Sequence, residues 1–110
     1  MATTYKVLAQ LAPSATTPST LYTVGASKSA IVSTLAVCNR AGTSGTYRIA
    51  VRPAGATLAN EHYIVYGATV AASDSILLTL GITLATTDVI TVYASSADMS
   101  FSVFGSEIDV

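Results

Sequence analysis

Short runs in which apolar and polar residues alternate occupy most of the chain. In the clearest run, Tyr47, Ile49 and Val51 alternate with Arg48 and Arg52. Successive side chains of a strand point to opposite faces, so this pattern predicts a half-buried strand with both arginines on its outer face. Eight segments are predicted to be strands on this basis: Tyr5–Leu11, Thr20–Val24, Ala30–Asn39, Thr46–Arg52, His62–Tyr66, Ile76–Leu80, Val89–Ala94 and Met99–Phe104.

The longest of these segments, Ala30–Asn39, is apolar on both faces. A strand buried on both sides lies in the middle of its sheet, and we expect that position here. Strict alternation predicts that Ile31, Leu35 and Val37 share one face and that Val32, Ala36 and Cys38 share the other.

Glycine, proline, serine and aspartate separate the predicted strands at short, regular intervals, as in sandwiches and jelly rolls. The chain is therefore predicted to be all-β: a single-domain antiparallel β-sandwich of jelly-roll type, with about eight strands, spanning residues 1–110. Only Ala54–Glu61 has helix-like content, enough for one turn. Residues 1–4 and Gly105–Val110 are expected to be short arms that add a strand to a partner's sheet.

Charged residues make up 10% of the chain, whereas soluble domains average about 25%. Hydrophobic residues make up 51%. Thr, Ser and Ala must therefore cover much of the surface, and we expect part of that surface to pack against other protein, where charge is depleted. This composition predicts a homo-oligomer or a subunit of a larger assembly.

The charge distribution argues against two other classes of partner. The net charge is −1, and the five basic residues are scattered. Nucleic-acid binding needs clustered Lys and Arg, so no nucleic-acid partner is expected. No run approaches the roughly 18 apolar residues of a membrane-spanning helix, so no membrane partner is expected either. The N-terminal residues make a poor signal peptide, which favours assembly in the cytoplasm.

Few residues carry reactive chemistry. Cys38 is the only cysteine, so an intrachain disulfide is excluded, and we expect it to be a small buried hydrophobe. His62 follows Glu61, but neighbouring strand residues point to opposite faces. A zinc site needs three or four ligands, more than Cys38 and His62 supply. We therefore expect a hydrogen-bonded or interfacial His62, turn roles for most acids, and a non-enzymatic protein without cofactor, metal or catalytic residue.

Arginines and tyrosines are the candidates for contacts with partners. Arg40, Arg48 and Arg52 form the candidate subunit interface, because a guanidinium pairs with a carboxylate through two parallel hydrogen bonds. Arg48 or Arg52 is expected to meet an acid of a neighbouring subunit; the alternative is a solvated strand face. Alternation also predicts Tyr63 beside Val65 on one face and Tyr66 on the other. Tyrosines that stack on sugar rings would instead indicate a receptor module.

Several strings resemble small all-β virion structural proteins of tailed phages, including those of cyanobacteria. The strings are TLYTV, VSTLAVCNR, YRIAVRPAGA, LTLGITL and DVITVYASSADMSFSVFGSEI. The resemblance implies a homo-oligomeric part of a virion assembled in the host cytoplasm. The role expected first is that of a capsid decoration (cement) protein, which forms a trimer and contacts the major capsid protein. The alternatives are a tail, baseplate or fibre component, and a carbohydrate-binding module for host adsorption.

Overall fold

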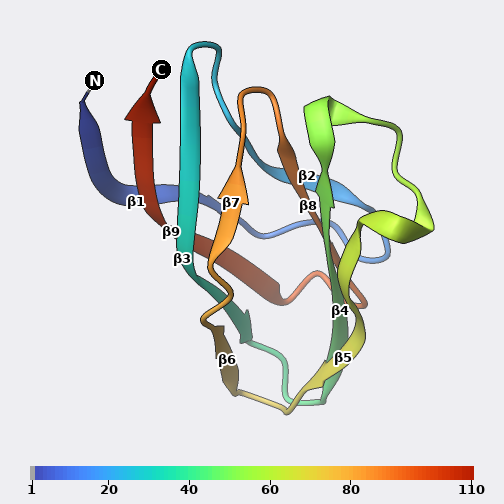
Figure 1. The fold of residues 1–110 in the computed structure, drawn as a ribbon. Helices are drawn as coiled ribbons and strands as arrows, with labels where there is room; N and C mark the ends of the chain where they lie inside the picture. The colour runs from blue at the N-terminus through green and yellow to red at the C-terminus, as the bar shows by residue number, and fades with distance from the viewer. Residues whose placement is uncertain (1) are drawn as a thin grey trace.

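A computed structural model describes residues 2–110, which form two antiparallel sheets packed face to face. The predicted all-β sandwich is confirmed (Figure 1). Sheet A has the order β1-β9-β3-β6, with β7 also paired to β3, and sheet B has the order β2-β8-β4-β5. The strands are β1 Thr3–Leu11, β2 Ser19–Thr23, β3 Lys28–Asn39, β4 Gly45–Arg52, β5 Tyr63–Val70, β6 Ser75–Leu78, β7 Ile82–Leu84, β8 Val89–Ala94 and β9 Met99–Asp109.

The strand pairs are nested along the chain. Strand β4 pairs with β5, β3 with β6 and β7, β2 with β8, and β1 with β9. Alternate pairs belong to opposite sheets, as if one long hairpin had been rolled over itself. This is the jelly-roll arrangement. Strand β3 lies between β9 and β6/β7, so its predicted central position is confirmed.

The core lies between the two sheets and is almost entirely apolar. Tyr47 of sheet B meets Phe101 of sheet A edge to face, with ring centroids 6.3 Å apart. Leu35, Ile49 and Ile90 are fully buried around this pair. Burial of large apolar side chains is the main stabilising contribution to such a fold.

One buried amide connects the loops at one end of the sandwich. Asn39, at the end of β3, is 1% exposed. Its Nδ2 donates to the carbonyl oxygens of Thr43, Val70 and Ala71, and its Oδ1 accepts from the N–H of Ala41. Because every polar atom of the amide is paired, its burial is tolerated and it fixes three segments together.

Strand β9 is enclosed by a bulge on each side. The register with β1 shifts between Val7 and Ala9, and the register with β3 shifts between Val32 and Thr34. Gly105 of β9 lies at this point, and a Cβ there would overlap the carbonyl oxygen of Ile31. Bulges bend strands, and β1 and β9 turn together about halfway along sheet A (Figure 1).

The bulge in β3 also makes the predicted division of its side chains wrong. Ser33 is the extra residue, so the alternation changes phase there. Val32, Leu35 and Val37 are buried together, whereas Ile31 faces outward. Cys38 is exposed on the outer face, and the expectation of a buried thiol is wrong.

Strand β5 departs from simple alternation for the same reason. Its register with β4 shifts twice, and the strand continues through Gly67, where φ is +74°, to Val70. Tyr63 and Tyr66 consequently lie on the same face, edge to face with centroids 4.9 Å apart. The predicted separation of these tyrosines is therefore wrong.

Two further expectations need correction, and a third is met. Residues Thr3, Thr4 and Gly105–Asp109 are paired within sheet A, so they are not free arms; Met1 lies outside the described residues.

Instead of one strand over Ile76–Leu80, β6 and β7 both pair with β3, on either side of Gly81, where φ is +62°. The expected helical turn is present as two short 3₁₀ turns, η1 Pro53–Gly55 and η2 Asn60–His62.

Replacing Gly105 by alanine tests how closely the strands pack at the double bulge. We expect Gly105→Ala to lower the free energy of unfolding by about 3 kcal/mol, because backbone must move to admit the methyl group. Chemical denaturation measures the change. Gly42→Ala is the matched control, since nothing lies within 4 Å of its Cβ position. Equal stability of the two variants would contradict the packing described at Gly105.

Candidate functional site

The outer face of sheet A carries apolar side chains among Ser, Thr and Gln, and the strand register of the described residues assigns no charged residue to it. Cross-strand register places Tyr5, Ser106 and Ile31 in one row and Val7 beside Phe104 in the next. The charged residues of these strands occupy the alternate positions, which face the other way. They are Lys6, Lys28, Glu107 and Asp109.

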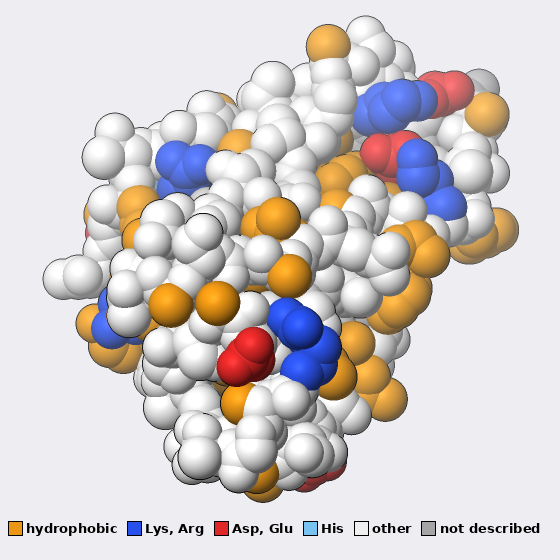
Figure 2. Space-filling model, turned by 180° about the vertical axis from the view of Figure 1, so that it is seen from behind, with side chains coloured by type: hydrophobic (Ala, Val, Ile, Leu, Met, Phe, Trp, Pro, Cys, Tyr) orange, Lys and Arg blue, Asp and Glu red, His pale blue; other side chains and the backbone are white. Residues whose placement is uncertain are grey.

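Several large apolar side chains of this face are open to solvent. Tyr5 is 84% exposed, Leu77 69% and Val7 47%. In Figure 2, hydrophobic side chains line the flank below the cluster of charged groups. Tyr5, Val7, Ile31 and Phe104 lie in adjacent rows, whereas Leu77 lies apart on β6. Exposed apolar patches mark contact sites.

An open hollow of about 520 Å³ lies in this face where sheet A bends. Tyr5, Val7, Ile31 and Phe104 supply its apolar walls. Lys6, Ser33, Gly105 and Ser106 complete the lining. Its size is in the range of ligand pockets or of a pocket for one large side chain. Sequence reasoning missed this hollow because Gly105 was read as the end of a strand. An isolated glycine within an alternating run is a signal of close backbone approach.

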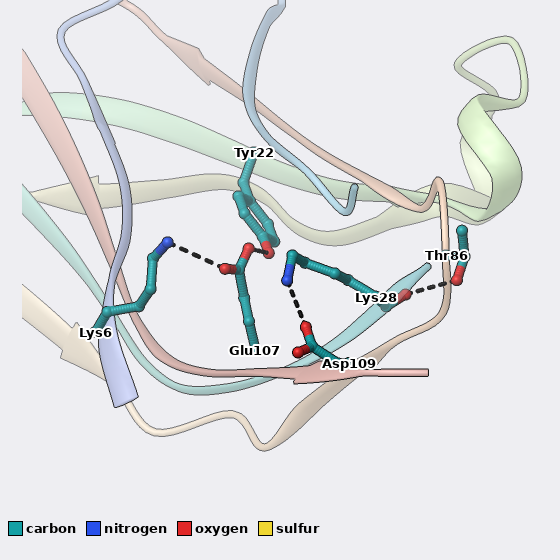
Figure 3. A network of polar contacts seen from close by, with 6 residues as sticks. All are labelled: Lys6, Tyr22, Lys28, Thr86, Glu107 and Asp109. Atoms are coloured by element: carbon teal, nitrogen blue, oxygen red, sulfur yellow. Dashed lines mark hydrogen bonds and ion pairs between the residues drawn. The ribbon is translucent and has the colours of Figure 1, made fainter. Parts of the chain in front are cut away.

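A cluster of polar side chains lies at the end of the sandwich near both chain termini (Figure 3). The buried Tyr22 of sheet B donates its hydroxyl to Glu107 Oε2 at 2.6 Å, and Lys6 Nζ contacts Glu107 Oε1 at 3.0 Å. These hydrogen bonds, from Tyr22 first and Lys6 second, lower the pKa of Glu107. Burial, together with the bond to Glu107 and its charge, raises the pKa of Tyr22. The cluster therefore links β9 to the opposite sheet.

A second ion pair lies beside the first. Lys28 Nζ contacts Asp109 Oδ1 at 2.5 Å, and this hydrogen bond raises the pKa of Lys28. Thr86 donates its hydroxyl to the carbonyl oxygen of Lys28 at 2.5 Å. These groups pair with one another within the chain, which supports a structural role for the cluster.

The outer face of sheet B carries a guanidinium held between two aromatic rings. The register sets Arg48 between Tyr93 of β8 and Tyr66 of β5. The guanidinium carbon lies 4.1 Å from the centroid of Tyr93 and 4.2 Å from that of Tyr66, within the range of cation–π contact. Tyr63 packs edge to face against Tyr66, which restrains the Tyr66 ring.

The three predicted interface arginines have different environments. Arg52 donates to Thr91 Oγ1 and to the carbonyl oxygen of Ala56. Arg40 donates to the carbonyl oxygen of Ala97, at the turn between β8 and β9. Arg48 has no hydrogen bond or ion pair within residues 2–110. The structure thus does not gather the three into one site, and only Arg48 keeps a free guanidinium.

The remaining candidate groups make local hydrogen bonds. His62 Nδ1 accepts a hydrogen bond from the N–H of Ala59 at 3.0 Å, as expected for a structural histidine. Asp88 accepts N–H groups of Ala54 and Ala85, and Asp74 accepts that of Ser75. Over residues 2–110 no three His, Cys, Asp or Glu side chains converge in a way that would hold a metal ion. That part of the chain also contains no helix long and apolar enough to span a membrane.

Comparisons with protein-family models, with curated proteins and with solved structures found no match. The interpretation of both surfaces therefore depends on their chemistry and geometry.

Acid titration tests the role of Glu107. A carboxyl whose pKa is lowered by folding stabilises the fold above its unfolded pKa, about 4.3, and this stabilisation is lost as the pH falls through the folded value. We expect Glu107→Gln to be less stable than the wild type at neutral pH and to lose less stability on acidification. Urea denaturation at a series of pH values measures both effects.

The matched control for this titration is Asp98→Asn, which removes one exposed carboxylate that has no side-chain partner within the described residues. It should leave the stability at neutral pH near that of the wild type. If the free energy of unfolding falls equally steeply with decreasing pH in Glu107→Gln and in the wild type, the role assigned to Glu107 is contradicted.

Proposed function

We propose that this protein is a non-enzymatic structural subunit of a tailed-phage particle, and that it docks on neighbouring virion proteins through the outer face of sheet A. The observation that carries the proposal is the hollow in this face, whose walls are mainly apolar and lie beside the exposed Tyr5, Val7 and Ile31. Interfaces deplete charge at their centre, and their strongest contacts are large side chains seated in such pockets.

The jelly-roll fold is compatible with this role, but it does not select it. The same fold occurs in viral capsid proteins, lectins and cupins, so function has to be argued from the surfaces. The support comes from the sequence resemblance to virion proteins, together with a charged-residue content of 10%. Lys6 and Lys28 pair with Glu107 and Asp109 of the same chain. These charges therefore need no partner on another protein.

Within the particle, the head is the proposed location, where the protein acts as a decoration subunit that bridges capsid proteins. A tail, baseplate or fibre position would use the same surface chemistry. Cryo-electron microscopy of particles from the phage that encodes the chain distinguishes these positions. Density for the chain on the capsid supports the head assignment, and density in the tail replaces it. Particles that lack the chain altogether would overturn the proposed function.

Charges placed on the outer face of sheet A test the docking surface. We expect Tyr5→Asp and Leu77→Asp to weaken binding to phage heads by about tenfold or more, because an unpaired carboxylate buried in an interface costs several kcal/mol. Heads prepared from a phage that lacks this protein serve as the binding target, and co-sedimentation measures binding.

Ser44→Asp is the control for this experiment, since Ser44 is exposed in the loop between β3 and β4, outside sheet A. It should bind as the wild type does. Far-UV circular dichroism verifies the fold of each variant. Wild-type binding by both sheet A variants would exclude this face as the docking surface.

A further inference from the structure

The guanidinium of Arg48 is held in place but has no hydrogen-bond or ion-pair partner within residues 2–110. This planar group is held between Tyr66 and Tyr93 at 4.2 and 4.1 Å. Tyr66 is 64% exposed, so this cluster opens to solvent. Restraint by the rings reduces the conformational entropy that Arg48 would lose on binding.

The chemistry of this cluster fits a carboxylate. A guanidinium offers N–H donors in a fixed fork that matches the two oxygens of a carboxylate. Arg and Tyr are also the residues most enriched among the strong contacts of protein interfaces. Sugar recognition needs several polar groups around the stacking ring, and the register neighbours of Arg48 are the two tyrosines. The cluster therefore favours an acidic side chain of a protein.

The chain itself contains acids that are available to a second copy. Glu107 and Asp109 are paired with lysines, and Asp74 and Asp88 accept backbone N–H groups. Within the described residues, the exposed side chains of Glu61 and Asp98 make no hydrogen bond or ion pair. Each copy thus carries one unoccupied arginine and two unoccupied carboxylates.

Glu61 is the better placed of these two acids. It lies in η2, directly before β5, the edge strand of sheet B that carries Tyr63 and Tyr66. Asp98 lies instead at the turn that Arg40 contacts, where Arg40 donates its backbone N–H to the carbonyl oxygen of Asp98. A cation therefore already lies near Asp98.

We infer that Arg48 binds the carboxylate of Glu61 in a second copy of this chain, across the edge of sheet B at β5. The inference rests on the proposed function only in that the protein works as an assembly of copies. It concerns sheet B and self-association, whereas docking on the particle uses sheet A. The two proposals can therefore fail separately.

Charge reversal of the purified full-length chain tests this contact by sedimentation velocity. The wild type is expected to form oligomers. Arg48→Glu and Glu61→Arg should each raise the dissociation constant about tenfold or more, since like charges then face each other. The double variant Arg48→Glu with Glu61→Arg should recover most of the wild-type affinity, because it restores an opposite-charge pair. Should Arg48→Glu fail to fold, Arg48→Gln provides the same readout.

Asp98→Arg is the matched control, because it reverses the other unoccupied acid and should leave the oligomer intact. Dissociation by Asp98→Arg but not by Glu61→Arg would overturn the assignment of Glu61. A wild type that stays monomeric at its highest soluble concentration would overturn the contact altogether. So would a monomer that binds a trigalacturonate probe through Arg48, which would make the cluster an acidic-sugar site. If the monomeric wild type still binds phage heads, the proposed function is unaffected.

Discussion

The close approach of three strands at Gly105 is the constraint on which the shape of sheet A depends. Strand β9 passes between β1 and β3 where both are bulged, and the space beside Gly105 admits no Cβ because the carbonyl oxygen of Ile31 occupies it. The bend at this point has two consequences. It opens the hollow on the outer face, and it carries the last residues of β9 to the end of the sandwich, where Glu107 reaches Tyr22 of the opposite sheet.

The charged residues of sheet A gather at one end of the sandwich, and the strand register assigns none of them to the outer face. The lysines at positions 6 and 28 pair with Glu107 and Asp109 at one end of the sandwich. Those exposed ion pairs contribute little stability individually. Their main effect is on the surface, since the charges of sheet A sit on the alternate side of their strands. A charged-residue content of 10% is thus compatible with a sandwich that has one face suited to protein contact.

The two broad faces of the sandwich offer different chemistry. Sheet A presents aliphatic and aromatic side chains around a hollow, whereas sheet B presents a single guanidinium between tyrosine rings. The proposals above assign these surfaces to two different contacts, sheet A to the particle and sheet B to a second copy of the chain. Unlike chemistry keeps one kind of contact from competing with the other, because a charge is costly in the apolar face and an apolar side chain leaves the guanidinium unpaired.

Alternation in the sequence determined the all-β class and the outward position of Arg48 and Arg52, because a period of two assigns side chains to faces directly. The central place of β3 was inferred from apolar residues on both faces, although only the face toward the core is buried. Alternation does not reveal a bulge, and one extra residue moves every later side chain to the other face. For this reason the faces of Ile31 and Tyr66 were assigned wrongly. Only the tertiary structure decided which arginine stays unoccupied and that Gly105 lies beside a hollow, since both depend on strands brought together from distant parts of the chain.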